Sequence, residues 1–301
     1  MLNPEMIGKI VQIASVLEVS GYPKPGNVHR TRDYDDMVFE DFLISGIVIG
    51  DHLRHLSKRT IENKDDLSKI QIGKAVYDAV TETNEWIENN TNLGIVMMTF
   101  PIGAAAAISN NMEELRDNIG KIMAVSTVED AIYLYDAINI ASAGGMGDQD
   151  EYDVTSDKAK EELIKNNQTL WDVLKISAPW DDLASELTSK MPIIFEFSYP
   201  IYSELRVNNS LNKSGVLTFL EILQKVPDTL ISRKYNDEVA SEVSVKTRDL
   251  LKYKDLENFE EYLHEFDNYL YDNHLNPGTT ADLTAATIMV YYINNEFEKT
   301  N

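Results

Sequence analysis

The sequence predicts an all-α fold, arranged as a single multi-helix globular domain over residues 1–301. Apolar residues recur three and four positions apart along most of the chain, which is the spacing of one face of a helix. Runs that alternate apolar and polar residues, as a half-buried strand requires, are scarce. No internal repeat and no low-complexity linker divides the chain. One helical domain is therefore the simplest architecture.

The first helix is expected over residues 3–20, because Asn3 is a good cap and Pro4 suits the first helical position. Ser126 and Glu129 have the spacing of a capping box and predict another helix start. The remaining helices are predicted by apolar periodicity alone. They are expected at 36–59, 67–88, 93–109, 158–177, 181–206, 214–226, 238–251, 257–273 and 280–297. Residues 144–157 are glycine-rich and then acidic, which predicts a long loop.

The chain is strongly acidic, with a formal net charge of -23. Such a surface repels phosphate backbones and anionic lipids, so we expect neither nucleic acid nor membrane as a partner. The absence of cysteine excludes thiolate chemistry and fits a reducing compartment. The longest apolar run, residues 94–108, is shorter than a bilayer span, and the N-terminus does not resemble a signal peptide. We therefore expect a cytoplasmic protein, for which a homodimer is one possible assembly.

Glu18 is the first candidate for chemistry. It ends the apolar stripe of the first helix, where it is partly desolvated and meets the negative end of the helix dipole. A cation should compensate for it, and Lys24, Arg30, Arg32 or a divalent metal ion are the candidates. A plain ion pair or a solvated helix end remains the alternative.

The loop after Glu18 is the second candidate. Two prolines pre-organise Lys24, and Gly26 permits a close backbone approach to a ligand. Lys24 and Arg30 suit a polyphosphate, and the following Asp35 and Asp36 suit the oxygen preference of Mg²⁺. As a loop residue, Lys24 is expected to contribute little to folding. The alternatives are a stiff connector for the loop and helix-start residues for the two aspartates.

The third candidate lies near the C-terminus, where a turn containing Asn276, Gly278 and Thr279 precedes a helix. Backbone N–H groups at such a start can receive phosphate. Alternatively, Thr279 caps this helix and Asp282 completes the box.

Three segments of the chain form a recognisable set. They are residues 18–28, EVSGYPKPGNV, which Asp36, Met37, Phe42 and Ser45 continue; residues 90–94, NTNLG; and residues 276–283, NPGTTADL. In this order they resemble the opening, second and third motifs of the triphosphoribosyl-dephospho-CoA synthase family. The chain differs at His29, where the family has Asp, and at residues 34–35 and 92–93, where the family has His-Lys. The two His-Lys replacements remove cations that would contact phosphate, and they leave open a different acceptor or even a different nucleotide.

This resemblance implies an all-helical transferase that uses ATP as triphosphoribosyl donor, releases adenine and modifies a ribose hydroxyl of dephospho-CoA. A nucleotide-like acceptor and Mg²⁺ would then be its partners. Alternatives are a related pentosyl transferase or nucleosidase with another acceptor, and a non-catalytic nucleotide-binding protein. The site residues that the resemblance and the residue chemistry together suggest fall into three groups. They are Glu18, Asp36 and Asp282 for catalysis; Lys24, Gly26, Arg30, Asn90, Asn276, Gly278 and Thr279 for nucleotide binding; and Glu18, Asp35 and Asp36 for metal.

Overall fold

The computed structural model describes residues 1–87, 89–141, 154, 156 and 158–300. Within these residues the protein is helical, and the only bridges between extended residues are two isolated ones in the segment 29–37. The predicted all-α class is therefore confirmed. The predicted glycine-rich, acidic loop at 144–157 lies almost entirely outside the described residues.

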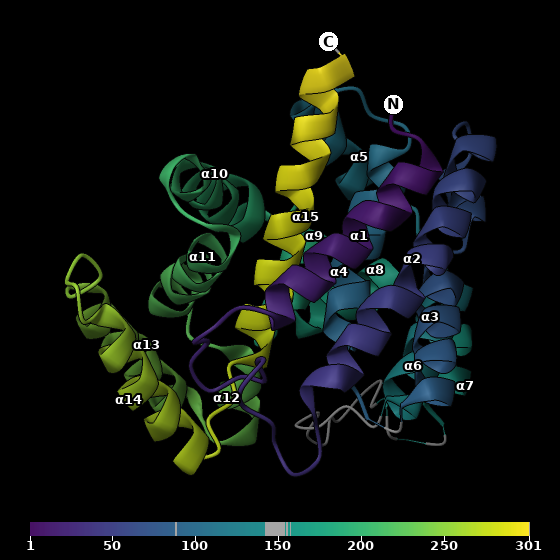
Figure 1. Ribbon diagram of the computed structural model, residues 1–301. Coiled ribbons are helices and arrows are strands. Elements are labelled where there is room, and N and C mark those ends of the chain that lie inside the picture. Colours follow the sequence, from purple (N-terminus) through teal and green to yellow (C-terminus); the bar gives the residue numbers. More distant parts are fainter. Residues whose placement is uncertain (88, 142–153, 155, 157, 301) are drawn as a thin grey trace.

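The helices follow one another with short connections (Figure 1). In chain order they are α1 (Pro4–Val19), α2 (Phe39–Glu62), the 3₁₀ turn η1 (Leu67–Ile70), α3 (Ile72–Trp86), α4 (Leu93–Ala106), α5 (Met112–Ala124), α6 (Val128–Ile140), α7 (Ala159–Lys165), α8 (Leu170–Ser177), α9 (Asp182–Thr188), the π-helical turn η2 (Ile193–Ser198), α10 (Tyr199–Asn208), α11 (Leu211–Lys225), α12 (Thr229–Lys234), α13 (Asp237–Leu251), α14 (Phe259–Asp272) and α15 (Gly278–Thr300).

Local signals placed the first helix correctly and misplaced others. Asn3 caps α1 by accepting from the backbone N–H of Glu5, as predicted. The start of α6 is capped by Thr127 with Asp130, one residue beyond the expected pair. The expected helices 158–177 and 181–206 are each divided, and α5 and α12 were not expected. Helix α12 has only six residues, and so short a helix leaves little periodicity in a sequence. Helix α5 has 13 residues, and its buried Leu115, Ile119 and Ile122 do recur at helical spacing, so this helix was overlooked rather than hidden.

The apolar residues form two cores that share helices. The larger core takes side chains from α1 to α10 and from most of α15, and the smaller core takes them from α11 to α14. Helix α11 contributes Ile222 to the first core and Phe219 to the second, while α15 contributes Ala281 to the second. In Figure 1 the yellow α15 runs between the green group α10–α14 and the helices α1–α6. The start of α15 therefore lies where the two groups of helices meet.

None of the helices in the described part of the chain is long and apolar enough to cross a membrane.

Candidate active site

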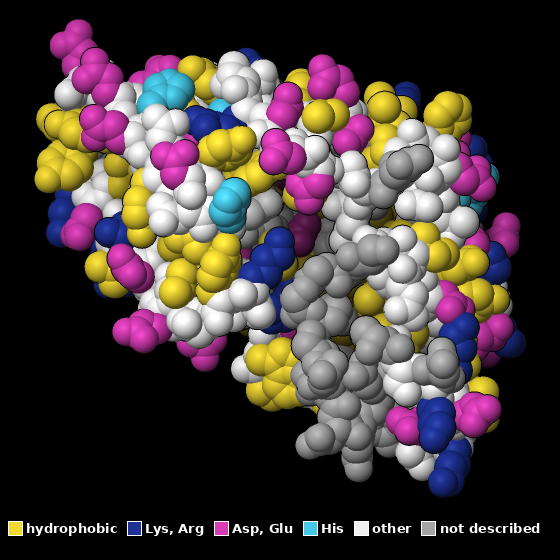
Figure 2. Space-filling model, turned by 90° about the horizontal axis from the view of Figure 1, so that it is seen from below, with side chains coloured by type: hydrophobic (Ala, Val, Ile, Leu, Met, Phe, Trp, Pro, Cys, Tyr) yellow, Lys and Arg dark blue, Asp and Glu magenta, His cyan; other side chains and the backbone are white. Residues whose placement is uncertain are grey.

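A cavity of about 480 Å³ lies where several helix ends meet. Its walls come from the end of α1, the start of α4, the ends of α6 and α8, the start of α9, α12 and the start of α15. Figure 2 shows the molecule from below, where the surface is hollowed near its middle and Lys and Arg side chains lie beside the hollow. The cavity has an apolar part, formed by side chains of α4, α6, α8 and α9, and a polar part near α12 and α15.

Most of the predicted site residues line this cavity. They are Glu18, Asp36, Asn90, Asn276, Gly278, Thr279 and Asp282. Residues 18 and 282, at nearly opposite ends of the chain, thus share one site. The remaining predicted residues, Lys24, Gly26, Arg30 and Asp35, are absent from the lining.

Lys24 is the compensating cation for Glu18. Its ammonium lies 2.5 Å from Glu18 Oε1 and donates a second hydrogen bond to the Glu18 carbonyl oxygen. Both side chains are almost fully buried. Burial raises the pKa of Glu18 and lowers the pKa of Lys24, and the ion pair partly offsets both shifts. The expectation that Lys24 contributes little to folding rested on a place outside the core, and that premise is wrong, because Lys24 is buried in the interior with a carboxylate partner.

The rest of the loop is held by Asp267 of α14. This fully buried carboxylate accepts from the backbone N–H of Gly26 at 3.0 Å and from Arg32 Nε at 3.0 Å, and it lies 3.2 Å from His29 Nε2. Gly26 has φ of 73°, and a Cβ there would lie 2.6 Å from the carbonyl oxygen of Leu275. The role of Gly26 in the structure is thus backbone packing, which only glycine permits.

Arg30 and Asp35 are directed elsewhere. The Arg30 guanidinium donates to Asn212 Oδ1 at 2.6 Å and lies over the ring of Tyr22. Asp35 is exposed and precedes α2, whose first N–H is instead accepted by Asp33. The alternative that Asp35 and Asp36 begin a helix is therefore wrong, since α2 starts at Phe39.

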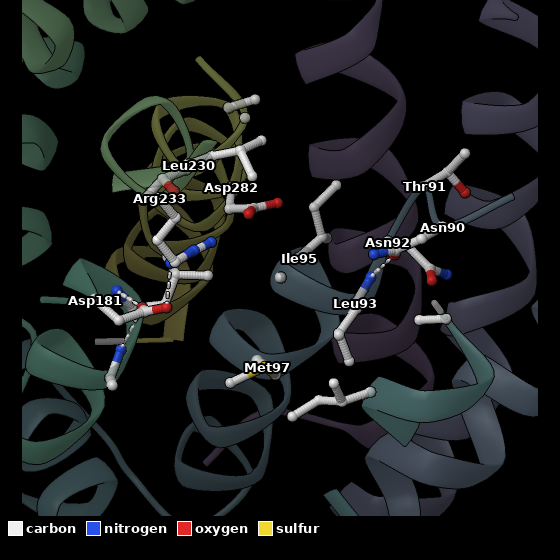
Figure 3. Close-up of a pocket in the computed structure, with 18 of the residues that line it drawn as sticks. Asn90, Thr91, Asn92, Leu93, Ile95, Met97, Asp181, Leu230, Arg233 and Asp282 are labelled. Carbon is white, nitrogen blue, oxygen red and sulfur yellow. Dashed lines mark hydrogen bonds and ion pairs between the residues drawn. The ribbon is translucent and has the colours of Figure 1, made fainter. Parts of the chain in front are cut away.

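The second and third motifs meet at Gly94 and Asp282. A Cβ on Gly94 would lie 2.0 Å from Asp282 Oδ2, so the carboxyl group lies against the backbone of the first turn of α4. Asn90 accepts from the N–H of Leu93 at the same turn, and Asn276 accepts from Asn27 Nδ2 at 2.8 Å. These contacts join all three motifs around one space. Figure 3 shows Asp282 on one side of it and residues 90–93 on the other.

Asp282 sits among other carboxyl groups. Burial raises its pKa well above the ordinary value, and the negative charges of Glu18 and Asp228 raise it further. The predicted capping box at this helix start is wrong: α15 already begins at Gly278, and Asp228 accepts from the N–H and hydroxyl of Thr280 at 2.7 and 2.8 Å. Asp282 is consequently left to face the cavity.

Sequence reasoning missed the residues of α12 and α9. Arg233, Lys234 and Asp181 line the cavity, and Arg233 Nη1 lies 2.5 Å from Asp181 Oδ2. An aspartate cap at 228 followed by a basic pair at 233–234 was the available signal, but a six-residue helix is too short for periodicity to reveal.

The comparisons with known proteins agree with this geometry. Residues 4–301 match the family described as ATP:dephospho-CoA triphosphoribosyl transferase. The chain belongs to this family. It is thus a transferase of the triphosphoribosyl-dephospho-CoA synthase type, which is the activity that the three motifs imply.

Two proteins to which the chain is similar carry names of the same kind. A protein from Malonomonas rubra named "Probable 2-(5''-triphosphoribosyl)-3'-dephosphocoenzyme-A synthase" is 24% identical over 305 residues, which cover 96% of this chain and 88% of the relative. A crystal structure from Archaeoglobus fulgidus, whose name provisionally assigns it to the same synthases, superposes with a TM-score of 0.62. It is 20% identical and covers 81% of this chain and 98% of its own. This second likeness shows a shared fold.

Proposed function

We propose that the chain moves the triphosphoribosyl group of ATP to a ribose hydroxyl of dephospho-CoA and releases adenine in the cavity described above. The observation that carries this proposal is the pair of carboxyl groups, Glu18 and Asp282, that line one cavity in different electrostatic surroundings. Transfer of a glycosyl group needs one group that takes a proton and one that gives it.

The charged groups around Glu18 and Asp282 decide which of the two acts as the base and which as the acid. The charge of Glu18 raises the pKa of Asp282, so the two do not ionise readily together. Only Glu18 contacts an ammonium group, that of Lys24. Glu18 therefore carries the negative charge and acts as the base, while Asp282 keeps its proton and acts as the acid.

The reaction then balances in protons and bonds. The acceptor hydroxyl oxygen forms a bond to C1′ of the donor ribose as the C1′–N9 bond to adenine breaks. The hydroxyl proton passes to Glu18, and the proton of Asp282 passes to the departing adenine. Positive charge that develops at C1′ is stabilised by the carboxylate of Glu18. Lys24 acts through Glu18 as a positioning residue.

Magnesium remains part of the proposal. Among the described residues, no three His, Cys, Asp or Glu side chains gather closely enough to hold a metal ion by themselves. Mg²⁺ often takes only one or two protein carboxylates and completes its shell with phosphate and water oxygens. Asp36, which is exposed and lines the cavity, fits this role better than Asp35, and Glu18 is already paired. When bound, the ion would neutralise triphosphate charge at a protein of net charge -23.

The apolar part of the cavity suits the adenine ring or the apolar stretch of the acceptor. Tyr135 and Ile138 of α6, Val173 and Leu174 of α8, and Trp180 beyond α8 provide its surface. Such walls bind a flat base by excluding water. A reaction that consumes ATP belongs in the cytoplasm, which is the compartment that we propose.

Adenine release tests the proposal. The purified protein is incubated with ATP and Mg²⁺, with and without dephospho-CoA, and the products are separated and weighed by mass spectrometry. Adenine that appears only with dephospho-CoA, together with an acceptor heavier by one triphosphoribosyl group, is the expected result. Adenine release without acceptor would indicate a nucleosidase, and binding of ATP without adenine release would indicate a nucleotide-binding protein.

A further inference from the structure

The cations that line the cavity come from one short helix. Among the described lining residues, Arg233 and Lys234 are the only arginine or lysine, and they face four carboxyl groups, those of Glu18, Asp36, Asp181 and Asp282. The cations expected from the sequence are engaged elsewhere, since Lys24 is buried against Glu18 and Arg30 is bonded to Asn212. The end of α12 is therefore where a phosphate group would meet positive charge inside the cavity.

The position of α12 is fixed at its other end. Asp228, which is buried, accepts from the N–H groups of Leu230 and Ile231 and from Thr280 at the start of α15. Thr229 Oγ1 donates to Thr279 Oγ1 at 3.1 Å. These bonds tie α12 to α15, the helix that carries Asp282. Arg233 is thereby held on the same side of the cavity as Asp282, as Figure 3 shows.

The guanidinium of Arg233 has donors to spare. Nη1 contacts Asp181, Nε is buried without a hydrogen-bond partner, and no described residue accepts from Nη2, which is therefore the donor left for a ligand. Asp181 is itself occupied, because its Oδ1 accepts from the N–H groups of Leu183 and Ala184 at the start of α9. The side chains of Arg233 and Asp181 remain 20% and 24% exposed, and both line the cavity. A planar fork with unused donors, held by one carboxylate, is suited to a phosphate oxygen.

We propose that Arg233, together with Lys234, is the phosphate-binding site of this cavity and that Asp181 holds the guanidinium in place before the ligand arrives. The ligand class is a phosphoanhydride, which is the chemistry shared by the triphosphate of the donor and the diphosphate of the acceptor. This inference rests on the proposed function for the identity of its ligands. Asp181 lies beside the incoming phosphate, so the charge that it adds opposes binding.

Calorimetry on the whole protein tests the site with three probes at fixed Mg²⁺ and ionic strength: inorganic tripolyphosphate, ATP and dephospho-CoA. Arg233→Gln should weaken tripolyphosphate binding by about ten- to hundred-fold, the usual effect of losing a charged hydrogen bond. Arg233→Lys should recover part of that loss. Asp181→Asn should not weaken binding, because the amide oxygen can still accept from Arg233 Nη1 while the negative charge that opposes phosphate is removed. Arg116→Gln is the matched control, since Arg116 pairs with Glu196 outside the cavity and the change in net charge is the same.

The other two probes identify the source of the phosphate. Weaker binding of ATP with unchanged dephospho-CoA assigns the site to the donor, and the reverse assigns it to the acceptor. Arg233→Gln leaves the charge of Asp181 unpaired and could unfold for that reason. In that case the double variant Arg233→Gln with Asp181→Asn, which removes this charge, is used in place of the single variant in all three titrations.

Affinities for all three probes equal to those of Arg116→Gln would overturn the inference. Adenine release by the wild-type protein is measured separately, so the proposed function and this inference can fail independently.

Discussion

The carboxyl group of Asp282 on α15 lies directly against Gly94 on α4, at a point where any side chain on residue 94 would meet it. This contact joins segments that are 188 positions apart, the difference between 282 and 94. It gives the second motif a physical reason for its glycine, because the acid can face the cavity only if position 94 has no Cβ.

Gly94→Ala should therefore impair catalysis more than folding. The added Cβ would lie 2.0 Å from Asp282 Oδ2, and the end of an aspartate side chain can rotate away. We expect turnover to fall by more than about ten-fold because an acid displaced by an ångström loses its alignment. Gly215→Ala is the control, since nothing lies within 4 Å of a Cβ there and alanine favours the helix by about 0.5–1 kcal/mol. Equal turnover in both variants would contradict this assignment.

Asp282→Asn should remove the acid and keep the shape. We expect turnover to fall by about 10²- to 10⁴-fold, the usual contribution of a positioned acid. Because the pKa of Asp282 is raised, wild-type activity should be lost as the pH rises through that pKa. The remaining activity of the variant should lack this alkaline decline. Rate profiles against pH for both proteins, with tripolyphosphate affinity as a check on binding, provide the measurement.

Lys24→Met should destabilise the protein and shift the acidic limb of its profile of rate against pH. Removal of one partner of a buried ion pair costs about 3–5 kcal/mol, and both side chains here are 2% exposed. Without the ammonium, the pKa of Glu18 rises further, so the base forms only at higher pH. The acidic limb of the rate profile should therefore move to higher pH.

The double variant Glu18→Gln with Lys24→Met is the control for Lys24. It leaves no unpaired charge, so it should recover stability in urea unfolding but not activity. If Lys24→Met instead keeps the wild-type midpoint and profile, the ion pair has no role.

Glu186 should make the protein less stable as the pH rises. Burial raises its pKa to about 7, although the N–H groups of Ile193 and Ile194 donate to its carboxylate at 2.8 and 3.0 Å. The folded state therefore binds a proton that the unfolded state has already lost between its ordinary pKa of 4.5 and about 7. As the pH rises from 4.5 to about 7, the unfolding free energy therefore falls by up to about 3 kcal/mol. Below this range both states bind the proton, so the loss of stability is absent.

Glu186→Gln has no such titration. Near pH 4.5 the variant should be less stable than wild type, because glutamine has one acceptor oxygen for the two N–H groups of Ile193 and Ile194. Between pH 4.5 and 8 the wild-type protein should lose stability and the variant should not, so the difference between them should shrink or reverse. Urea unfolding of both proteins across this range gives the difference directly. A constant difference would show that Glu186 does not titrate there.

The sequence predicted those features of the fold that neighbouring residues determine, such as the start of a capped helix. Asn3 and Pro4 mark the start of α1 without help from the rest of the chain, and the predicted cap is confirmed. The start of α15 was read wrongly because its cap, Asp228, lies 52 positions away in sequence. A contact of that kind has no local pattern. For the same reason the family motifs identified Asp282 as a site residue but gave no sign of Gly94 as its contact.

Lys24 and Arg233 illustrate a second limit of prediction from the sequence. Glu18 needed a cation, and sequence reasoning named Lys24 among four candidates; the structure selects it by a contact of 2.5 Å. The same reasoning then placed Lys24 on phosphate, a role that its burial does not favour. Arg233 escaped notice because exposure to a cavity depends on the packing of α9, α12 and α15.

The cavity is built from helix ends and connectors, while the two hydrophobic cores are built from helix faces. The polar residues that line the cavity lie outside the two cores, whereas apolar lining residues such as Tyr135, Val173 and Leu174 belong to the larger core. Exchange of the connector 89–92 or of the segment 226–236 with that of another member of the family would alter the cavity wall and leave most core side chains in place. The architecture therefore offers a scaffold on which acceptor preference can diverge, or be redesigned, one connector at a time.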